Sequence, residues 1–189
     1  MIFEGEYLNG KKIGKCKEYS WDGHLLFEGE YLNGRKNGKG TAYHYYSNCV
    51  NRNENEYLNG KLHGKIKEFD NENNILILEA EYSNGQKNGK FREYDSDGNL
   101  TFDGEYLKDC LNGLIKEYSG GELIFEGYYS NGAKNGNVKE YDFLSGKLIF
   151  EGIYKNNKKH GKAKEYDKNG NLIFDGEYIN GKKKNKNKK

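Results

Sequence analysis

Cysteines are the first side chains of this 189-residue sequence to consider for chemistry, because a thiolate can act as a nucleophile or a metal ligand. Cys16, Cys49 and Cys110 have no spacing typical of a metal site, and an odd number of cysteines does not form a closed disulfide framework. No histidine recurs beside Cys110 to activate it. We therefore expect free thiols in a reducing compartment, and a cytoplasmic protein.

The histidines and glutamates follow a repeat and do not form a single site. His63 and His160 each lie six residues after a tyrosine, at a position that holds asparagine elsewhere, as at Asn37. Both residue types tolerate left-handed backbone, so this position indicates a turn and not a metal ligand. Glutamate pairs such as Glu28 and Glu30 recur along the chain, whereas an active site occurs once. We predict no catalytic residues, no metal site and no cofactor.

The whole chain is organised by a repeat of about 24 residues, marked by a tyrosine that follows Gly-Glu in half of the copies. These marker tyrosines are Tyr7, Tyr31, Tyr57, Tyr82, Tyr106, Tyr129, Tyr154 and Tyr178. Twelve residues after each of the first seven lies a second aromatic residue: Tyr19, Tyr43, Phe69, Tyr94, Tyr118, Tyr141 or Tyr166. A fixed period of this length predicts an array of one supersecondary unit, in which each copy packs on its neighbours.

One copy has the pattern of a β-hairpin. Apolar residues and glycine alternate with Glu28 and Glu30 over residues 25–31, which is typical of a half-buried strand. Asn33-Gly34 and Asn37-Gly38 follow, and they predict a hairpin turn longer than two residues before a second strand over residues 39–43. An Asp-, Asn- and Gly-rich turn then leads to the next copy.

Two positions predict how the hairpins pack. A glycine two residues before the marker (Gly5, Gly29, Gly104, Gly127, Gly152, Gly176) indicates space for an aromatic ring from the adjacent strand. An apolar residue lies three positions before the second aromatic, at Cys16, Ile66, Phe91, Ile115, Val138 and Ala163. An odd offset places the two on opposite faces of a regular strand, so the pattern indicates either a bulge or a strand that is apolar on both faces.

The pattern Gly-Glu-Tyr-x-Asn-Gly-x-x-x-Gly-Lys-x-Lys-Glu-Tyr resembles the MORN repeat, in the variant form of bacterial antitoxin-like and protist proteins. The glycine seven residues after the marker supports this, at Gly14, Gly38, Gly64, Gly89, Gly113, Gly136 and Gly161. The resemblance implies an all-β fold, namely an elongated single-layer antiparallel sheet of consecutive hairpins, with about 15 strands. We predict an array of eight repeats over residues 1–181, the last incomplete, and a disordered Lys-rich tail over residues 182–189.

The resemblance implies a non-enzymatic scaffold or adaptor, and the sequence offers surfaces for it. An aromatic groove for a protein partner is predicted from Tyr31, Tyr43, Tyr45, Tyr46, Tyr57, Tyr82, Tyr106, Tyr129 and Tyr154. Tyr45, Tyr46 and Tyr57 lie with His44 at an irregular copy, which indicates either drift of the repeat or a partner-specific patch. Unpaired strand edges at Ile2-Phe3 and residues 172–178 predict a homo-oligomer.

Charge predicts two further alternatives and excludes a third. The formal net charge is +2, and six lysines within residues 182–189 leave the array at 25 minus 29, or −4. Basic turn residues form either a solvated surface or an edge that docks on anionic lipid: Lys11, Lys12, Arg35, Lys36, Lys61, Lys87, Lys134, Lys158 and Lys159. A peripheral membrane tether and an antitoxin-like inhibitor are therefore the alternatives. Nucleic acid is a poor partner, because the interleaved glutamates repel phosphate.

Overall fold

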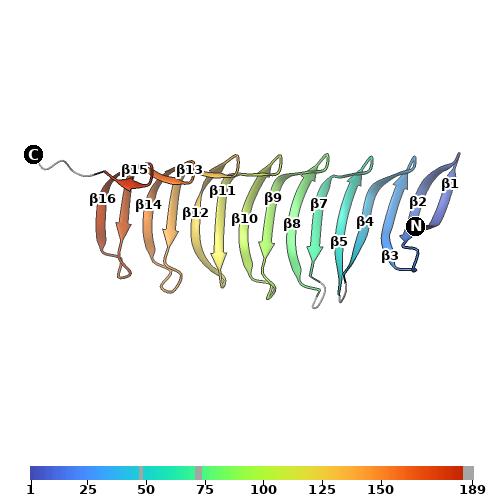
Figure 1. Cartoon of the computed structure of the whole chain (residues 1–189), viewed down its shortest axis with the longest axis horizontal. Helices are drawn as coiled ribbons and strands as arrows, with labels where there is room; N and C mark the ends of the chain where they lie inside the picture. The colour runs from blue at the N-terminus through green and yellow to red at the C-terminus, as the bar shows by residue number, and fades with distance from the viewer. Residues whose placement is uncertain (47–48, 71–73, 185–189) are drawn as a thin grey trace, which may run out of the picture. The chain divides into compact units, whose positions relative to one another are not determined.

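The computed structural model describes residues 1–46, 49–70 and 74–184, and these residues form β-strands and turns without a helix (Figure 1). The described residues form seventeen strands, paired antiparallel as consecutive hairpins, which confirms the predicted all-β class. The chain divides into two compact units, residues 1–98 and 99–189, and each is described by itself. The single array over residues 1–181 therefore stays a prediction.

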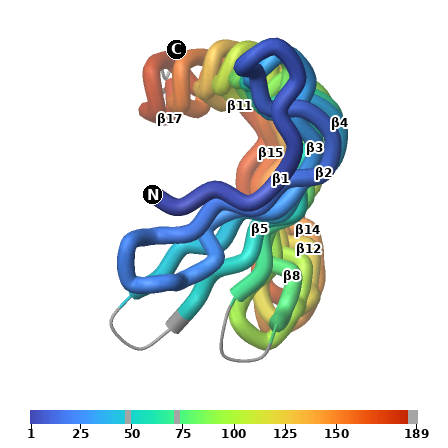
Figure 2. Tube along the Cα trace, turned by 90° about the vertical axis from the view of Figure 1, so that its right-hand side faces the viewer, coloured from blue at the N-terminus to red at the C-terminus, as the bar shows by residue number. Residues whose placement is uncertain are grey.

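Unit 1 contains four hairpins. Its strands are β1 (Ile2–Leu8), β2 (Lys11–Tyr19), β3 (Leu25–Leu32), β4 (Arg35–Tyr46), β5 (Cys49–Leu58), β6 (Lys61–Leu62), β7 (Gly64–Phe69), β8 (Leu76–Ser83) and β9 (Gln86–Tyr94). The tight turns lie at one end of the hairpins and the connections between copies at the other (Figure 2). Each of two tight turns bonds to a strand of the preceding copy, since the amide of Gly34 donates to the carbonyl of Lys12 in β2 at 2.9 Å, and that of Gly60 to the carbonyl of Lys36 in β4 at 2.8 Å.

Unit 2 repeats this arrangement. Its strands are β10 (Leu100–Leu107), β11 (Cys110–Ser119), β12 (Glu122–Ser130), β13 (Ala133–Tyr141), β14 (Leu148–Lys155), β15 (Lys158–Tyr166), β16 (Leu172–Ile179) and β17 (Lys182–Lys183). The two-residue strands β6 and β17 account for the difference from the predicted fifteen. β17 also shortens the predicted tail, because Lys182 and Lys183 pair with Ile179 and Tyr178, while residues 185–189 lie outside the described part.

The tight turns are shorter than predicted. Leu32 pairs with Arg35, so Asn33-Gly34 is a complete two-residue turn with φ of 52° and 82°. Two consecutive positive φ angles are typical of the type I′ turn, whose twist matches that of the flanking strands. The second glycine of the motif, Gly38, also has positive φ (88°), but it lies within β4 opposite the register shift between Gly29 and Tyr31. The motif therefore encodes a turn followed by a bulge, not one long turn.

The second strand of the sixth copy, β13, carries an apolar residue on one face and an aromatic residue on the other, which favours the two-sided strand over a bulge there. Val138 is buried on one face of β13, whereas Tyr141 on the other face donates a hydrogen bond to Glu126 at 3.0 Å. The register shift after Glu140 adds its extra residue to the neighbouring strand β14, because Glu140 pairs with Phe150 and Tyr141 with Leu148. β13 itself stays regular from Val138 to Tyr141.

The glycine before the marker makes room for a ring, but the ring comes mainly from its own strand. A Cβ added at Gly127 would lie 2.8 Å from the Phe125 ring and 2.5 Å from a methyl group of Val138 on the neighbouring strand. Phe125, Gly127, Tyr129 and Val138 thus share one face, which we call the aromatic face. Glu126 and Tyr128 alternate with them on the opposite face, which we call the charged face.

The irregular segment between the second and third copies is a longer hairpin. β4 and β5 pair from Gly38 and Tyr57 to Tyr46 and Cys49 without a register shift. Asn55 occupies the position of the usual glycine and is buried, and its side-chain amide donates to the Tyr57 hydroxyl at 3.0 Å. The polar segment thus replaces a packed Phe-Gly pair with a hydrogen bond.

Candidate functional site

The aromatic face is built from one constellation that recurs in both units. In the sixth copy, the rings of Phe125 and Tyr129 meet edge to face with centroids 6.0 Å apart. The Lys134 ammonium lies 3.4 Å from the Phe125 centroid and 3.0 Å from Oε1 of Glu117, which also accepts a 2.6 Å hydrogen bond from the Tyr129 hydroxyl. A cation held over a ring and paired with a carboxylate is stabilised by both contacts.

The same four residue types recur in the seventh and second copies. The Lys159 ammonium lies 3.6 Å from the Phe150 centroid, and the Tyr154 hydroxyl donates to Glu140 at 2.5 Å. In unit 1 the second-copy constellation consists of Phe27, Tyr31, Lys36 and Glu18, with Lys12 added. Each polar group of these constellations has a partner within the sheet, so the aromatic face is a satisfied structural layer.

The predicted groove tyrosines do not form one surface. Tyr31 and Tyr129 are buried in the aromatic face, where Tyr57, Tyr82, Tyr106 and Tyr154 are partly buried at the equivalent position. Tyr43 lies on the charged face and donates to Glu28 at 2.8 Å. Tyr45 and Tyr46 are exposed on the long β4–β5 hairpin, and Tyr45 packs against His24 with ring centroids 4.5 Å apart. The predicted groove tyrosines therefore lie in three separate environments.

The residues of the predicted basic edge fall into a partly buried set and an exposed set. Lys12, Lys36, Lys87, Lys134 and Lys159, which lie five residues after their markers, are partly buried; the four whose contacts are described lie over aromatic rings. Lys11, Arg35, Lys61 and Lys158, one residue earlier, are exposed. The two sets alternate along the strand, so they point to opposite faces. About half of the predicted lipid-binding charge is thus engaged inside the sheet.

Burial and hydrogen bonding shift the acidity of the engaged groups. Burial by itself would raise the pKa of Glu18, but hydrogen bonds from Lys12 and Tyr31 and the charge of Lys36 hold that pKa below its usual value. Burial and the hydrogen bond to Glu28 raise the pKa of Tyr43 to about 12. Burial and the hydrogen bond to Glu126 likewise raise the pKa of Tyr141 to about 12.

We expect the protein to lose stability in strong alkali, because these tyrosines fold in their protonated form. An unfolded tyrosine titrates near pH ~10, so the stabilisation is complete below that pH and is lost as the pH rises through the folded values. Phenolate absorbance and circular dichroism, recorded together, should show delayed ionisation followed by unfolding. In denaturant the 17 tyrosines should ionise in one step near pH ~10. Ionisation of every tyrosine near that pH in the folded protein would contradict the prediction.

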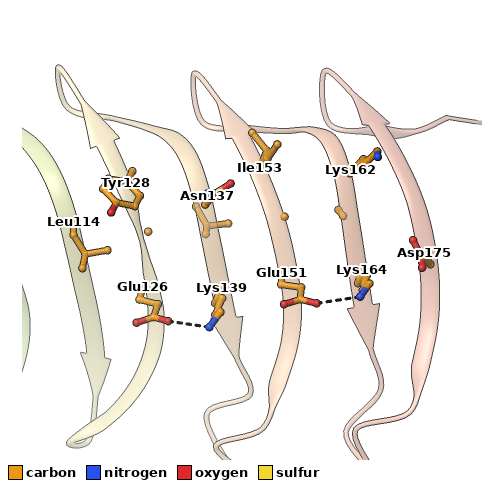
Figure 3. A pocket seen from close by; sticks show the side chains of 14 residues that line it. Leu114, Glu126, Tyr128, Asn137, Lys139, Glu151, Ile153, Lys162, Lys164 and Asp175 are labelled. Atoms are coloured by element: carbon orange, nitrogen blue, oxygen red, sulfur yellow. Dashed lines mark ion pairs between the residues drawn. The ribbon is translucent and has the colours of Figure 1, made fainter.

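The charged face carries a groove in each unit. In unit 2 a groove of about 660 Å³ crosses β11 to β16 (Figure 3). Its lining residues are Leu114, Glu126, Gly127, Tyr128, Asn137, Val138, Lys139, Glu151, Gly152, Ile153, Lys162, Ala163, Lys164 and Asp175. A groove of about 520 Å³ in unit 1 is lined from the same repeat positions, including Glu4, Gly5, Glu6, Lys15, Cys16 and Lys17. The backbone at the glycines forms the floor between two rows of side chains.

The residues that line these grooves are not among the site residues predicted from the sequence. To predict them, each alternating position must be assigned to one face of the sheet. That assignment depends on the position of the bulge that follows the tight turn, as at Gly38. A signal was nevertheless present, because the glutamate that precedes most markers is replaced by Tyr128 and Ile153 in two successive copies.

The remaining candidates for chemistry do not converge. Within the described ranges, no three His, Cys, Asp or Glu side chains gather as metal ligands. Cys16 is buried in the aromatic face, where burial raises the pKa of its thiol, and Cys110 is exposed in a strand next to a turn. The structure as described also contains no helix long and apolar enough to cross a membrane.

Comparison with known proteins supports the repeat assignment. The family model of the MORN repeat matches residues 3–24, 27–47 and 150–172, which correspond to the first, second and seventh copies. A comparison with curated proteins finds no match. The unmatched copies keep the marker tyrosine and are also built of antiparallel strands in the structure. Together with this all-β hairpin architecture, the three matches identify the chain as a MORN repeat protein.

Proposed function

We propose that the protein is a non-enzymatic scaffold that binds a protein partner through its charged face. MORN repeats are generally interaction modules for proteins or membranes, and they are generally non-enzymatic. The observation that carries the proposal is the groove that crosses the strands in unit 2 and recurs at the same repeat positions in unit 1. A groove with a backbone floor and exposed side chains along both walls suits recognition of a polypeptide.

The aromatic face is the poorer binding surface. Its lysines, glutamates and tyrosine hydroxyls are paired with one another, as in the Glu117, Tyr129 and Lys134 constellation. A partner that displaced these contacts would have to break them without an equal gain. We therefore propose the charged face as the interface. We also propose a cytoplasmic location, because thiols such as Cys16 stay reduced there.

Affinity capture tests this proposal. The full chain and a chain ending at Gly181 are used as baits in a lysate of the source organism, without detergent, and bound material is identified by mass spectrometry. We expect a stoichiometric protein retained by both baits. Capture of membrane material by the full chain alone would instead favour the lipid tether and overturn the scaffold. A captured toxin or enzyme whose activity falls on binding would identify the antitoxin-like alternative.

A further inference from the structure

The charged face of unit 2 contains a break in an otherwise regular row of charges. The row consists of the residue before each marker tyrosine and the residue eight positions after the marker of the preceding copy, which pair across adjacent strands. In most copies the pair is a lysine and a glutamate: Lys15 with Glu30, Lys39 with Glu56, Lys65 with Glu81 and Lys162 with Glu177. In two successive pairings of unit 2 the charges are absent. Leu114 pairs with Tyr128, and Asn137 pairs with Ile153. Four neighbouring strands, β11 to β14, therefore present uncharged side chains at one level.

Packing within the sheet does not explain this break. Leu114, Tyr128 and Ile153 are 44%, 50% and 37% exposed. The aromatic face of the same copies keeps its buried Phe125 and Phe150, so the core does not depend on the three. Exposed apolar residues that stand together in one row, between charged neighbours, mark a binding surface more often than single exposed ones.

The second row of the groove stays charged, and its charges alternate in sign. Glu126 and Lys139 approach to 3.6 Å and Glu151 and Lys164 to 3.7 Å, and Figure 3 shows this row running parallel to the uncharged one. Asp175 extends it by one strand. These ion pairs are more exposed than those of the aromatic face, so a ligand can contact them without breaking them. A ligand that fills the groove would therefore be apolar along one side and carry both acidic and basic groups along the other. A segment with charges of a single sign would meet repulsion at every second strand.

We propose that the uncharged row of unit 2 (Leu114, Tyr128, Asn137 and Ile153) is a docking site for an amphipathic α-helix of the protein partner, lying across the strands. Adjacent strands are ~4.8 Å apart, and a helix advances ~5.4 Å per turn. A helix with one apolar residue per turn can therefore place successive apolar residues near successive strands, from β11 to β14. An extended segment repeats its apolar side every ~6.7 Å and falls out of phase after one strand. The proposal rests on the scaffold function above and names the chemistry of its partner.

The residues that flank the row give the helix a direction. Glu105 continues the row on β10, and Lys162 continues it on β15. The N-terminus of a helix carries partial positive charge and its C-terminus partial negative charge. The N-terminus of the bound helix therefore lies toward Glu105 and its C-terminus toward Lys162. Five strand steps separate these residues, which corresponds to about 24 Å, or about 16 helical residues.

The repeat itself supplies a variant that removes the site and keeps the fold. The substitutions Leu114→Lys, Tyr128→Glu, Asn137→Lys and Ile153→Glu restore the residues that most other copies have at these positions. We call this protein the ladder variant. A matched control, Trp21→Glu with Leu144→Lys, changes two exposed apolar side chains outside the groove. Circular dichroism and thermal unfolding should show that both variants fold like the parent chain.

The probe is a peptide selected from a phage-displayed library of helix-forming sequences about 18 residues long, with the full chain as target. We expect the enriched peptides to have apolar residues spaced by three and four positions and charges of both signs. A synthetic peptide of this type should gain helicity on binding, lose at least tenfold in affinity for the ladder variant, and bind the control within twofold. A photo-cross-linker at its N-terminus should label β10 or β11, and one at its C-terminus β14 or β15.

Several results would overturn the inference. These are a selection without binders, enrichment of peptides with alternating apolar residues, binding without helix formation, or equal affinity for the ladder variant. Dimerisation of the parent chain that the ladder variant abolishes would assign the row to a second copy instead of a helix. Affinity capture separates the two proposals, because a partner retained equally by the ladder variant would leave the scaffold standing and remove the helix site.

Discussion

Replacing Phe150 by alanine is expected to lower the free energy of unfolding by about 3–5 kcal/mol, the usual cost of truncating a buried phenylalanine. Phe150 is 1% exposed, and its ring meets the rings of Tyr154 and Tyr178 at 5.9 and 6.3 Å. The Lys159 ammonium covers it at 3.6 Å. A single-layer sheet has no second layer that could close the resulting cavity. Urea denaturation followed by circular dichroism measures the loss.

Phe143→Ala is the matched control for this prediction. Phe143 belongs to the same unit but lies in the connection between β13 and β14, where it is 49% exposed. Its replacement should change the free energy of unfolding by no more than about 0.5 kcal/mol. Equal losses for the two variants would show that Phe150 has no special place in the core. Hydrogen exchange should report the Phe150→Ala effect first in β14 and its neighbours, because copies of a repeat array contact mainly adjacent copies.

Replacing Glu18 by alanine is expected to cost about 1.5–3 kcal/mol, the range for hydrogen bonds to charged groups. The Glu18 carboxylate accepts from Lys12 at 2.7 Å, lies 3.6 Å from the Lys36 ammonium and is hydrogen-bonded to Tyr31. Its loss leaves two cations over aromatic rings with no counter-charge. Both lysines keep some access to water, so the cost stays below that of a fully buried broken pair. Denaturant unfolding of the parent and variant measures it.

Two further variants make the Glu18 prediction specific. Glu18→Gln keeps an acceptor for Tyr31 but loses the charge. Its free energy of unfolding should therefore lie between that of the parent chain and that of Glu18→Ala. Glu177→Ala breaks an exposed ion pair with Lys184 and should cost clearly less than Glu18→Ala. If Glu18→Ala costs no more than Glu177→Ala, the constellation does not stabilise the sheet.

The pH dependence of stability gives a separate check on Glu18. The folded pKa of Glu18 lies below the ordinary value. The pKa of Glu165 is lowered as well: burial would raise it, but hydrogen bonds from Lys183 and Tyr178 lower it. A depressed carboxyl pKa contributes stability that is present above the unfolded value of ~4.3 and lost as the pH falls through the folded value. The parent chain should therefore weaken below about pH 4, and Glu18→Gln should weaken less steeply.

The sequence by itself determined the repeat, the hairpin and the family resemblance, because these depend on local and periodic information. The alternation of residues 25–31 predicts a strand, and Asn33-Gly34 favours the positive φ angles that the structure shows there. The fixed positions of the marker tyrosine and of the aromatic twelve residues later require one fold for all copies. Each feature is set by residues close together in the chain, so no knowledge of distant contacts was needed.

Only the tertiary structure decided which face each side chain occupies, and with it the candidate site. Because strand alternation has a period of two, the bulge at Gly38 changes which later residues share a face with Tyr31. Lys36 pairs with Tyr31 across the two-residue turn, so it lies over Phe27 instead of joining Arg35 at an exposed basic edge. The same assignment of faces brings Leu114, Tyr128 and Ile153 into one row from three separate copies. Such a row depends on pairing between strands, which a linear pattern does not specify until the register is known.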